Sequence, residues 1–265
     1  MWKNEIFRSS STPLSTLHSR SKQLFTYKEK KVSVELKTKA IVVRAVPYHE
    51  TDMIVTLVSA EYGKLTATAR GCLKPKAKLR YAAEPMNFGD YLLGGKAGRY
   101  VIADCSQIES FLPITSDIDK YYAASLTLEV LSKLTPDDAQ PALFVDALGA
   151  LNELAYGERE ADEIVTDFLL AALNDNGNSL DFAHCGICGC LIEGDAFFSV
   201  ADGIVCEHCK TFGCTLVDKV SRAYISGENR AISHALKLRA NLVLSEIIYE
   251  LLGTRIGSHY FAEQL

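Results

Sequence analysis

Residues 40–70, AIVVRAVPYHETDMIVTLVSAEYGKLTATAR, decide the fold class of the amino-terminal half of the chain. The runs 40–46 and 53–58 are apolar and rich in β-branched side chains, which favour strands. In 64–70 small or apolar residues alternate strictly with polar ones, a period of two that is typical of a half-buried strand. The stretch therefore predicts three consecutive strands separated by short turns.

Two more strands are predicted farther along, at 89–93 and 100–105, with a glycine-rich turn between them. Five short strands within about 75 residues are typical of a small closed barrel of the OB type. We assign residues 36–111 to an OB-fold domain.

The hydrophobic period changes after residue 112. Apolar residues then recur at helical spacing in 118–130, 144–154, 164–173, 216–224 and 231–252. The expected fold class is α+β multidomain, with an N-terminal OB-fold β-barrel followed by an α-helical domain over residues 112–265. A four-cysteine module is inserted in that helical domain.

The inserted module carries a regular cysteine motif. Cys185-Gly-Ile-Cys188 and Cys206-Glu-His-Cys209 are separated by 17 residues. Two residues between paired cysteines let one tight turn aim both sulfurs at one ion, and two such pairs complete a tetrahedral shell. A full shell leaves no position for water, so we expect a structural zinc ion within residues 183–214.

Other side chains in this segment compete as ligands: His184, Cys190, His208 and Cys214. They form no second pair with two-residue spacing, although Cys190 could replace Cys188 in a looser loop. Four reduced core cysteines without metal, or an iron-sulfur cluster, are further alternatives. The usual cysteine spacings of such clusters differ from two separated pairs, and the regular spacing favours zinc over both alternatives.

Charge is distributed unevenly along the chain, whose formal net charge is -5. Residues 37–111 carry 11 Lys and Arg against 7 Asp and Glu, whereas residues 112–265 carry 10 against 23. A polyanion is therefore expected to meet the barrel. The candidate residues for contact with its phosphates are Arg44, Lys64, Arg70, Lys74, Lys76, Lys78 and Arg80.

The segment Lys74-Pro75-Lys76-Ala77-Lys78 is predicted to be a loop at the barrel edge, because proline is disfavoured inside strands. OB barrels bind single strands by combining such charges with stacking aromatic rings. The alternative is a solvated loop beside aromatic residues buried in the barrel. The aromatic residues in question are Tyr48, Tyr62, Tyr81 and Phe88.

The last helices carry four further positive residues: Arg222, Arg230, Lys237 and Arg239. We expect them on solvated helix faces, and the alternative is that they receive an acidic protein tail.

Residues 1–35 are rich in Ser, Thr and Lys and lack apolar periodicity, which predicts a flexible extension; a transit peptide is the other interpretation. No apolar run approaches the roughly 18 residues that a membrane span needs, and no secretory signal is evident. We expect a cytoplasmic protein without membrane association.

Motifs of zinc deaminases, zinc proteases, serine hydrolases and phosphate-loop enzymes are absent from the sequence, so we expect no catalytic residues and no enzyme activity.

Several short motifs resemble those of the RecO family of bacterial recombination mediators. Ala40-Ile-Val-Val-Arg44, His49-Glu50-Thr51-Asp52, Gly63-Lys64 and Ala69-Arg70-Gly71 are similar to the family's barrel signature. The two cysteine pairs look like its zinc module, and residues 254–265 are similar to its carboxyl-terminal tail. The resemblance covers about residues 36–265. The chain departs from the family at Lys74-Pro75-Lys76, where an arginine-rich run is usual, and some relatives lack the cysteines.

The resemblance implies binding to single- and double-stranded DNA, annealing of complementary strands, and help in loading RecA onto strands coated by single-strand binding protein. It implies RecR and single-strand binding protein as partners, RecA as an indirect partner, and a place at the nucleoid in the cytoplasm. An RNA-binding or ribosome-associated OB protein would carry a similar barrel and zinc module. An enzyme with a catalytic metal is the third hypothesis.

Overall fold

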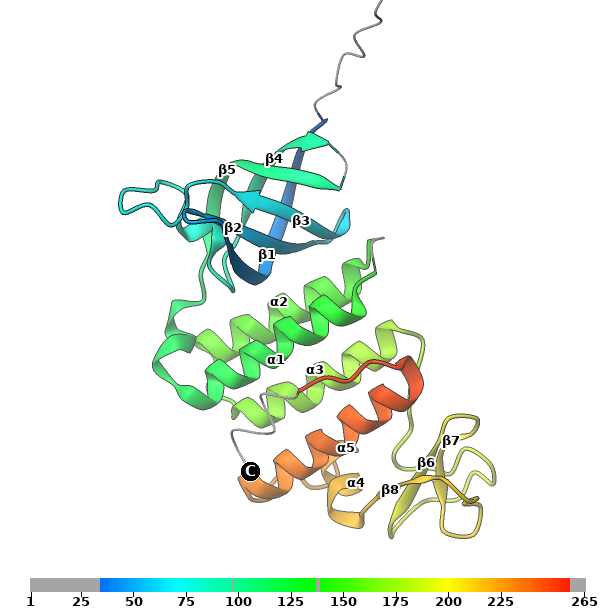
Figure 1. Ribbon diagram of the computed structural model, residues 1–265. Helices are drawn as coiled ribbons and strands as arrows, with labels where there is room; N and C mark the ends of the chain where they lie inside the picture. Colours follow the sequence, from blue (N-terminus) through cyan, green and yellow to red (C-terminus); the bar gives the residue numbers. More distant parts are fainter. Residues whose placement is uncertain (1–33, 97, 137–138, 258–265) are drawn as a thin grey trace, which may run out of the picture. The chain divides into compact units, whose positions relative to one another are not determined.

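The computed structural model describes residues 34–96, 98–136 and 139–257 (Figure 1). The extension predicted for residues 1–35 lies outside this part of the chain, except for Val34 and Glu35, which begin the first strand. No helix within the described ranges is both long and apolar enough to cross a membrane.

Five strands close into a barrel with the order β1-β2-β3-β5-β4. They are β1 Val34–Tyr48, β2 Asp52–Ser59, β3 Gly63–Ala69, β4 Phe88–Lys96 and β5 Arg99–Glu109. Paired neighbours are antiparallel except β3 and β5, which run parallel. This closure confirms the predicted OB-like barrel.

The barrel has an apolar interior of its own. Leu65, Ala67 and Ala69 of β3 are buried there, as the alternation in the sequence predicts. Tyr91 is fully buried as well, and its hydroxyl donates a hydrogen bond to the carbonyl of Ala82 at 3.1 Å. The polar end of this large ring is thus satisfied inside the barrel.

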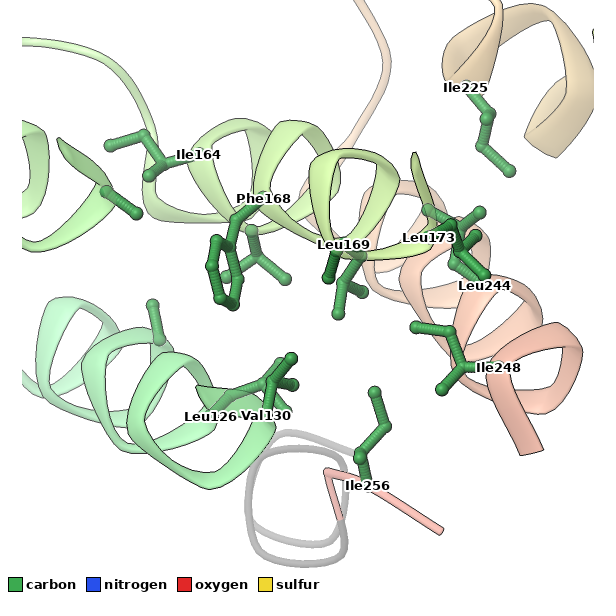
Figure 2. Packing of buried hydrophobic residues seen from close by; sticks show 14 of the residues in the cluster. Leu126, Val130, Ile164, Phe168, Leu169, Leu173, Ile225, Leu244, Ile248 and Ile256 are labelled. Carbon is green, nitrogen blue, oxygen red and sulfur yellow. The ribbon is translucent and has the colours of Figure 1, made fainter. Parts of the chain in front are cut away.

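The described residues after the barrel form five α-helices, preceded by a short 3-10 helix, η2 Leu112–Ser116. They are α1 Ile118–Leu134, α2 Pro141–Tyr156, α3 Ala161–Asp175, α4 Lys219–Ile225 and α5 His234–Leu252. Their apolar faces meet in one cluster, which we call the helical core. Figure 2 shows side chains of α1, α3 and α5 facing one another there: Leu126, Val130, Phe168, Leu169, Leu244 and Ile248.

A three-stranded sheet with the order β7-β6-β8 lies between α3 and α4 in the chain. Its strands are β6 Ala196–Ser199, β7 Gly203–Cys206 and β8 Thr215–Val217. The prediction of a helix from residue 216 is therefore wrong at its start. Helix α4 begins only after Asp218, whose carboxylate accepts the N–H groups of Val220 and Ser221 at 3.1 and 3.2 Å.

The outer face of the barrel packs against the helices. Ile41 of β1 and Val58 of β2 are fully buried in the helical core, although they belong to barrel strands. The rings of Phe88 on β4 and Phe144 on α2 make an edge contact, with centroids 6.1 Å apart. The barrel and the helices therefore share one apolar interface.

A β-bulge in β1 changes the face that its side chains occupy. The pairing register with β2 shifts between Val42 and Arg44, so that Val43 is the extra residue. Val42 before the shift and Ala45 after it both pack inside the barrel, while Val43 packs against the helical core. Arg44 is exposed. Uninterrupted alternation would have turned Arg44 into the barrel interior.

Candidate metal centre and nucleic-acid interface

Cys185, Cys188, Cys206 and Cys209 converge in the inserted module. Their sulfur atoms all lie within 4.8 Å of one another. Cys206 ends β7 and Cys209 lies in the turn that follows, in which the N–H of Cys209 donates to the carbonyl of Cys206 at 3.0 Å. Four sulfurs this close could hold one metal ion.

The sulfur spacing suits a tetrahedral shell. Metal–sulfur bonds of about 2.3 Å in a tetrahedron place two sulfurs about 3.8 Å apart. The Cys188 and Cys206 sulfurs are separated by 3.8 Å. Cys185 and Cys206 are buried, whereas Cys188 is exposed. The four side chains present therefore fit the group that the sequence predicts.

Two glycines shape the first cysteine turn, as the sequence suggests. The N–H of Gly186 donates to the carbonyl of Ile204 at 2.7 Å, and a Cβ at this position would lie 2.2 Å from the carbonyl oxygen of Asp202. Gly189 has a φ of +70° and its N–H donates to the carbonyl of Cys185 at 2.8 Å. Both positions require glycine, because one has no room for a side chain and the other has a left-handed backbone.

Backbone amides favour the thiolate form of two of these cysteines. Burial opposes ionisation of Cys185, but N–H groups of Cys188 and Cys206 donate to its sulfur, and the pKa falls to about 6. Burial also opposes ionisation of Cys206, and an amide hydrogen bond from Cys209 lowers the pKa of that thiol. The thiolate is the form that binds metals.

Among the described residues, the competing ligands lie outside the group of four. The Nδ1 atom of His184 is 2.9 Å from the carboxylate of Asp181 on the surface. The sulfur of Cys214 is 3.5 Å from the hydroxyl of Thr211. Cys190 comes nearest, because its exposed thiol hydrogen-bonds to two of the four sulfurs. His208 does not join the group.

Arg222 of α4 links the cysteine module to the helices. The charge pattern of the sequence does not predict this role. Its side chain is 2% exposed and donates to the carboxylate of Glu228 at 2.6 and 2.8 Å. The same guanidinium donates to the carbonyls of Phe182 and Gly194 at 3.3 and 3.2 Å. These two carbonyls flank the first cysteine pair, so one buried arginine holds both ends of that segment.

The other positive residues of the last helices are also paired. Lys237 is 2% exposed, and its ammonium lies 2.8 Å from the carboxylates of both Glu160 and Glu163. Arg230 and Arg239 form ion pairs with Asp167 and Asp218. The prediction of solvated faces is wrong for Arg222 and Lys237, and these four residues do not make a free positive patch.

The predicted loop at the barrel edge is present. Residues 70–80, which we call the barrel-edge loop, connect β3 to the 3-10 helix η1 Tyr81–Ala83 without forming a strand. Its start is held by Asp52, whose carboxylate accepts the N–H of Gly71 at 2.7 Å. That amide and the hydroxyl of Thr51 lower the pKa of Asp52. Five of the seven residues predicted to contact nucleic acid lie in this loop, and all five are exposed: Arg70, Lys74, Lys76, Lys78 and Arg80.

Arg44 and Lys64 lie elsewhere on the barrel. Both residues line a groove of about 920 Å³ together with residues of α1 and of the segment after α5. The structure therefore divides the seven predicted contacts between this groove and the barrel-edge loop. None of the seven is part of an ion pair within the described ranges, so their charges remain available.

The interleaved aromatic residues divide between exposed and packed positions. Tyr48 and Tyr62 are each 43% exposed, as stacking would require. Tyr81 instead donates its hydroxyl to the carbonyl of Cys105 at 2.5 Å, and Phe88 packs on the helical core. The stacking alternative thus fits Tyr48 and Tyr62, the alternative of rings packed in the barrel fits Tyr81, and Phe88 fits neither because it packs outside the barrel.

The chain matches two known protein families in succession. Residues 33–111 match the family described as "Recombination protein O N terminal", and residues 115–221 match "Recombination protein O C terminal". The first match spans the barrel, and the second spans α1 to α3, the cysteine module and the start of α4.

Curated relatives extend the comparison. The DNA repair protein RecO of Streptomyces griseus is 32% identical over 183 residues, which cover 65% of this chain and 73% of the relative. The protein of the same name from Desulfitobacterium hafniense is 30% identical over 237 residues, covering 85% and 83%. That of Clostridium novyi is 27% identical over 227 residues, covering 84% and 89%. With matches to both family descriptions and similarity to these relatives over most of their length, the chain belongs to the RecO family of DNA repair proteins.

Proposed function

We propose that this protein binds single- and double-stranded DNA, anneals complementary strands, and helps to load RecA onto single strands coated by single-strand binding protein. RecR and single-strand binding protein are its proposed partners, and the nucleoid in the cytoplasm is its proposed place of action. The observation that carries the proposal is the barrel-edge loop on an OB-like barrel in a RecO-family chain. Its five exposed cations have no ion-pair partner among the described residues.

The loop suits contacts that do not depend on base sequence. Lysine and arginine neutralise phosphates whatever the base, and binding then releases condensed counterions. Two complementary strands repel each other through their phosphates, so a protein that neutralises both lowers the barrier to pairing. Exposed Tyr48 and Tyr62 could add stacking on unpaired bases. No bond to DNA needs to be made or broken in this scheme, which supports a role without catalysis.

We further propose that the four cysteines hold a structural zinc ion. Four thiolates saturate a tetrahedral zinc, and the ion bound there would fix the two turns of the module and leave no ligand position for a substrate. The chain's own contribution is the pair of amide-stabilised thiolates at Cys185 and Cys206 and the buried Arg222 that joins the module to α4. The proposed role of the metal is therefore to brace the helical part.

An annealing assay tests the proposed function. Complementary oligonucleotides that carry a donor and an acceptor fluorophore are mixed with the full chain, with and without single-strand binding protein. Faster annealing that falls steeply as salt rises is expected. No acceleration in either condition would contradict the proposal. Competition between unlabelled DNA and RNA of the same sequence then separates DNA binding from an RNA-binding role.

A further inference from the structure

The groove that contains Arg44 and Lys64 carries an excess of positive charge in an otherwise acidic region. Its four cations come from three parts of the fold: Arg44 and Lys64 from the barrel, Lys133 from α1, and Arg255 from the segment after α5. Residues 112–265 carry 10 Lys and Arg against 23 Asp and Glu, so two cations at one place in this region are unexpected. Among the described residues that line the groove, Glu129 is the one carboxylate.

The negative charge of Glu129 is already engaged by the protein. Its carboxylate is 2.7 Å from the ammonium of Lys133 and accepts the N–H of Gly257 at 3.1 Å. Lys133 also donates to the carbonyl of Arg255 at 2.6 Å and is still 43% exposed. The carboxylate therefore fixes the groove wall, and the four cations exceed this single carboxylate by three charges, an excess that attracts an anion.

The wall formed by the segment after α5 is held in place. Ile256 is 7% exposed and packs into the helical core near Val130 and Ile248 (Figure 2). The guanidinium of Arg255 lies over the ring of Tyr249, 4.0 Å from its centroid. This stacking positions the guanidinium without neutralising its charge. A preformed wall loses little conformational freedom when a ligand binds.

The barrel wall is fixed as well. The N–H of Lys64 donates to the carbonyl of Pro136 just after α1, at 3.3 Å, which joins the start of β3 to the helices. The bulge at Val43 turns the side chain of Arg44 to the outside of the barrel, on the same barrel wall as Lys64. Ser125 and Ser132 of α1 also line the groove with polar side chains. Cations from the barrel and from the helical part, with serine side chains in the same groove, match the oxygen-rich backbone of a nucleic acid.

We infer that a single DNA strand passes through this groove, with its phosphates between Arg44 and Lys64 on one side and Lys133 and Arg255 on the other. This inference rests on the proposed DNA binding and adds a second contact site on the helical part of the chain. The groove has a volume of about 920 Å³, near the upper end of the range of about 300–1,000 Å³ for small-ligand pockets. An open groove of this size suits a strand that continues beyond both of its ends. A space on the scale of a small-ligand pocket has room for a single strand but not for a duplex.

Salt titrations of a fluorescein-labelled oligothymidylate, read by anisotropy on the full chain, test the inference. The double variant Lys133→Gln/Arg255→Gln should flatten the plot of log affinity against log salt by about 1.4, at about 0.7 for each lost phosphate contact of a single strand. The control is Lys120→Gln/Lys219→Gln, which removes two charges from α1 and α4 outside the groove and should leave the slope unchanged. Because Lys133 also holds the segment after α5, Arg255→Gln alone is the second variant, with an expected change of about 0.7.

Two failures can be told apart. If the wild-type chain does not bind the oligothymidylate, the proposed function fails. If it binds and the slopes of both groove variants equal that of the control, only the groove assignment fails.

Acetylation of Lys133, followed by mass spectrometry, gives an independent measurement on the unmodified chain. The oligothymidylate should slow acetylation of Lys133 and leave that of Lys120 unchanged. Protection of Lys133 by polyglutamate or by a duplex, but not by the oligothymidylate, would overturn the assignment to a single strand.

Discussion

Replacing Lys74, Lys76 and Lys78 with glutamine removes three exposed charges from the barrel-edge loop. The backbone of the loop should survive, because its start is held by Asp52 and the buried Cys72, neither of which is changed. The variant therefore isolates the charge of the loop from its fold.

The expected size of the effect follows from counterion release. Each phosphate contact with a single strand contributes about 0.7 to the slope of log affinity against log salt, so three lost contacts flatten the slope by about 2.1. Between about 50 and 200 mM salt the wild-type chain should therefore lose about 18-fold more affinity than the variant. Annealing should slow in parallel, most visibly at low salt.

The assay is anisotropy of a labelled oligothymidylate over a salt series, followed by the annealing assay. A control with the same loss of net charge carries Lys120→Gln, Lys210→Gln and Lys219→Gln in the helical part. Equal slopes for the loop variant and the wild-type chain would refute the placement of phosphates at the barrel-edge loop. Equal slopes for the loop variant and the control, both flatter than the wild-type slope, would mean that net charge alone sets the binding.

Three further predictions concern the metal, the buried arginine and pH. Cys206→Ser should abolish bound zinc, measured by mass spectrometry of the metal, and lower Tm; a fully zinc-loaded variant with unchanged Tm would contradict the structural site. Arg222→Met should cost about 3 kcal/mol in urea unfolding, the low end for breaking a buried ion pair, because Glu228 is 45% exposed and stays hydrated; Lys219→Met, an exposed change on the same helix, is the control. Amide hydrogen bonding from Gly71 lowers the pKa of Asp52 below 3.8, so its carboxylate stabilises the fold above that pH, and this contribution is lost as pH falls through the lowered value. Asp52→Asn should consequently make Tm less dependent on pH below about 5, and an unchanged pH profile would count against the role of this carboxylate.

The features that the sequence could predict are those set by local spacing. Alternation in residues 64–70 predicts β3, because the pleat of a strand places every second side chain on one face. The cysteine pairs predict a cluster for a similar reason, since a two-residue spacing forces both sulfurs to one side of a turn. The proline in residues 74–78 correctly excludes a strand there.

The features that it could not predict depend on contacts between distant parts of the chain. Arg222 and Lys237 look like ordinary surface charges on helices, and their burial depends on carbonyls and carboxylates 28 to 77 residues away. The strand β8 is three residues long and exists because it pairs with β6, so its own sequence carries little signal. No local pattern shows that Lys133 and Arg255 meet, since 122 residues separate them.

The bulge at Val43 links the assembly of the fold to its proposed binding. One extra residue lets Val43 reach the helical core while Arg44 turns outward, whereas regular alternation would bury the guanidinium in the apolar barrel. The same residue thus joins the barrel to the helices and places a cation on the barrel wall of the groove. Because the opposite wall, with Lys133 and Arg255, is held by the helical core, a change that loosens the contact of Val43 should also disturb the facing cations. Binding in the groove is in this sense coupled to the barrel–helix interface. The barrel-edge loop is anchored on the barrel by Asp52 and should therefore contact DNA independently of that interface.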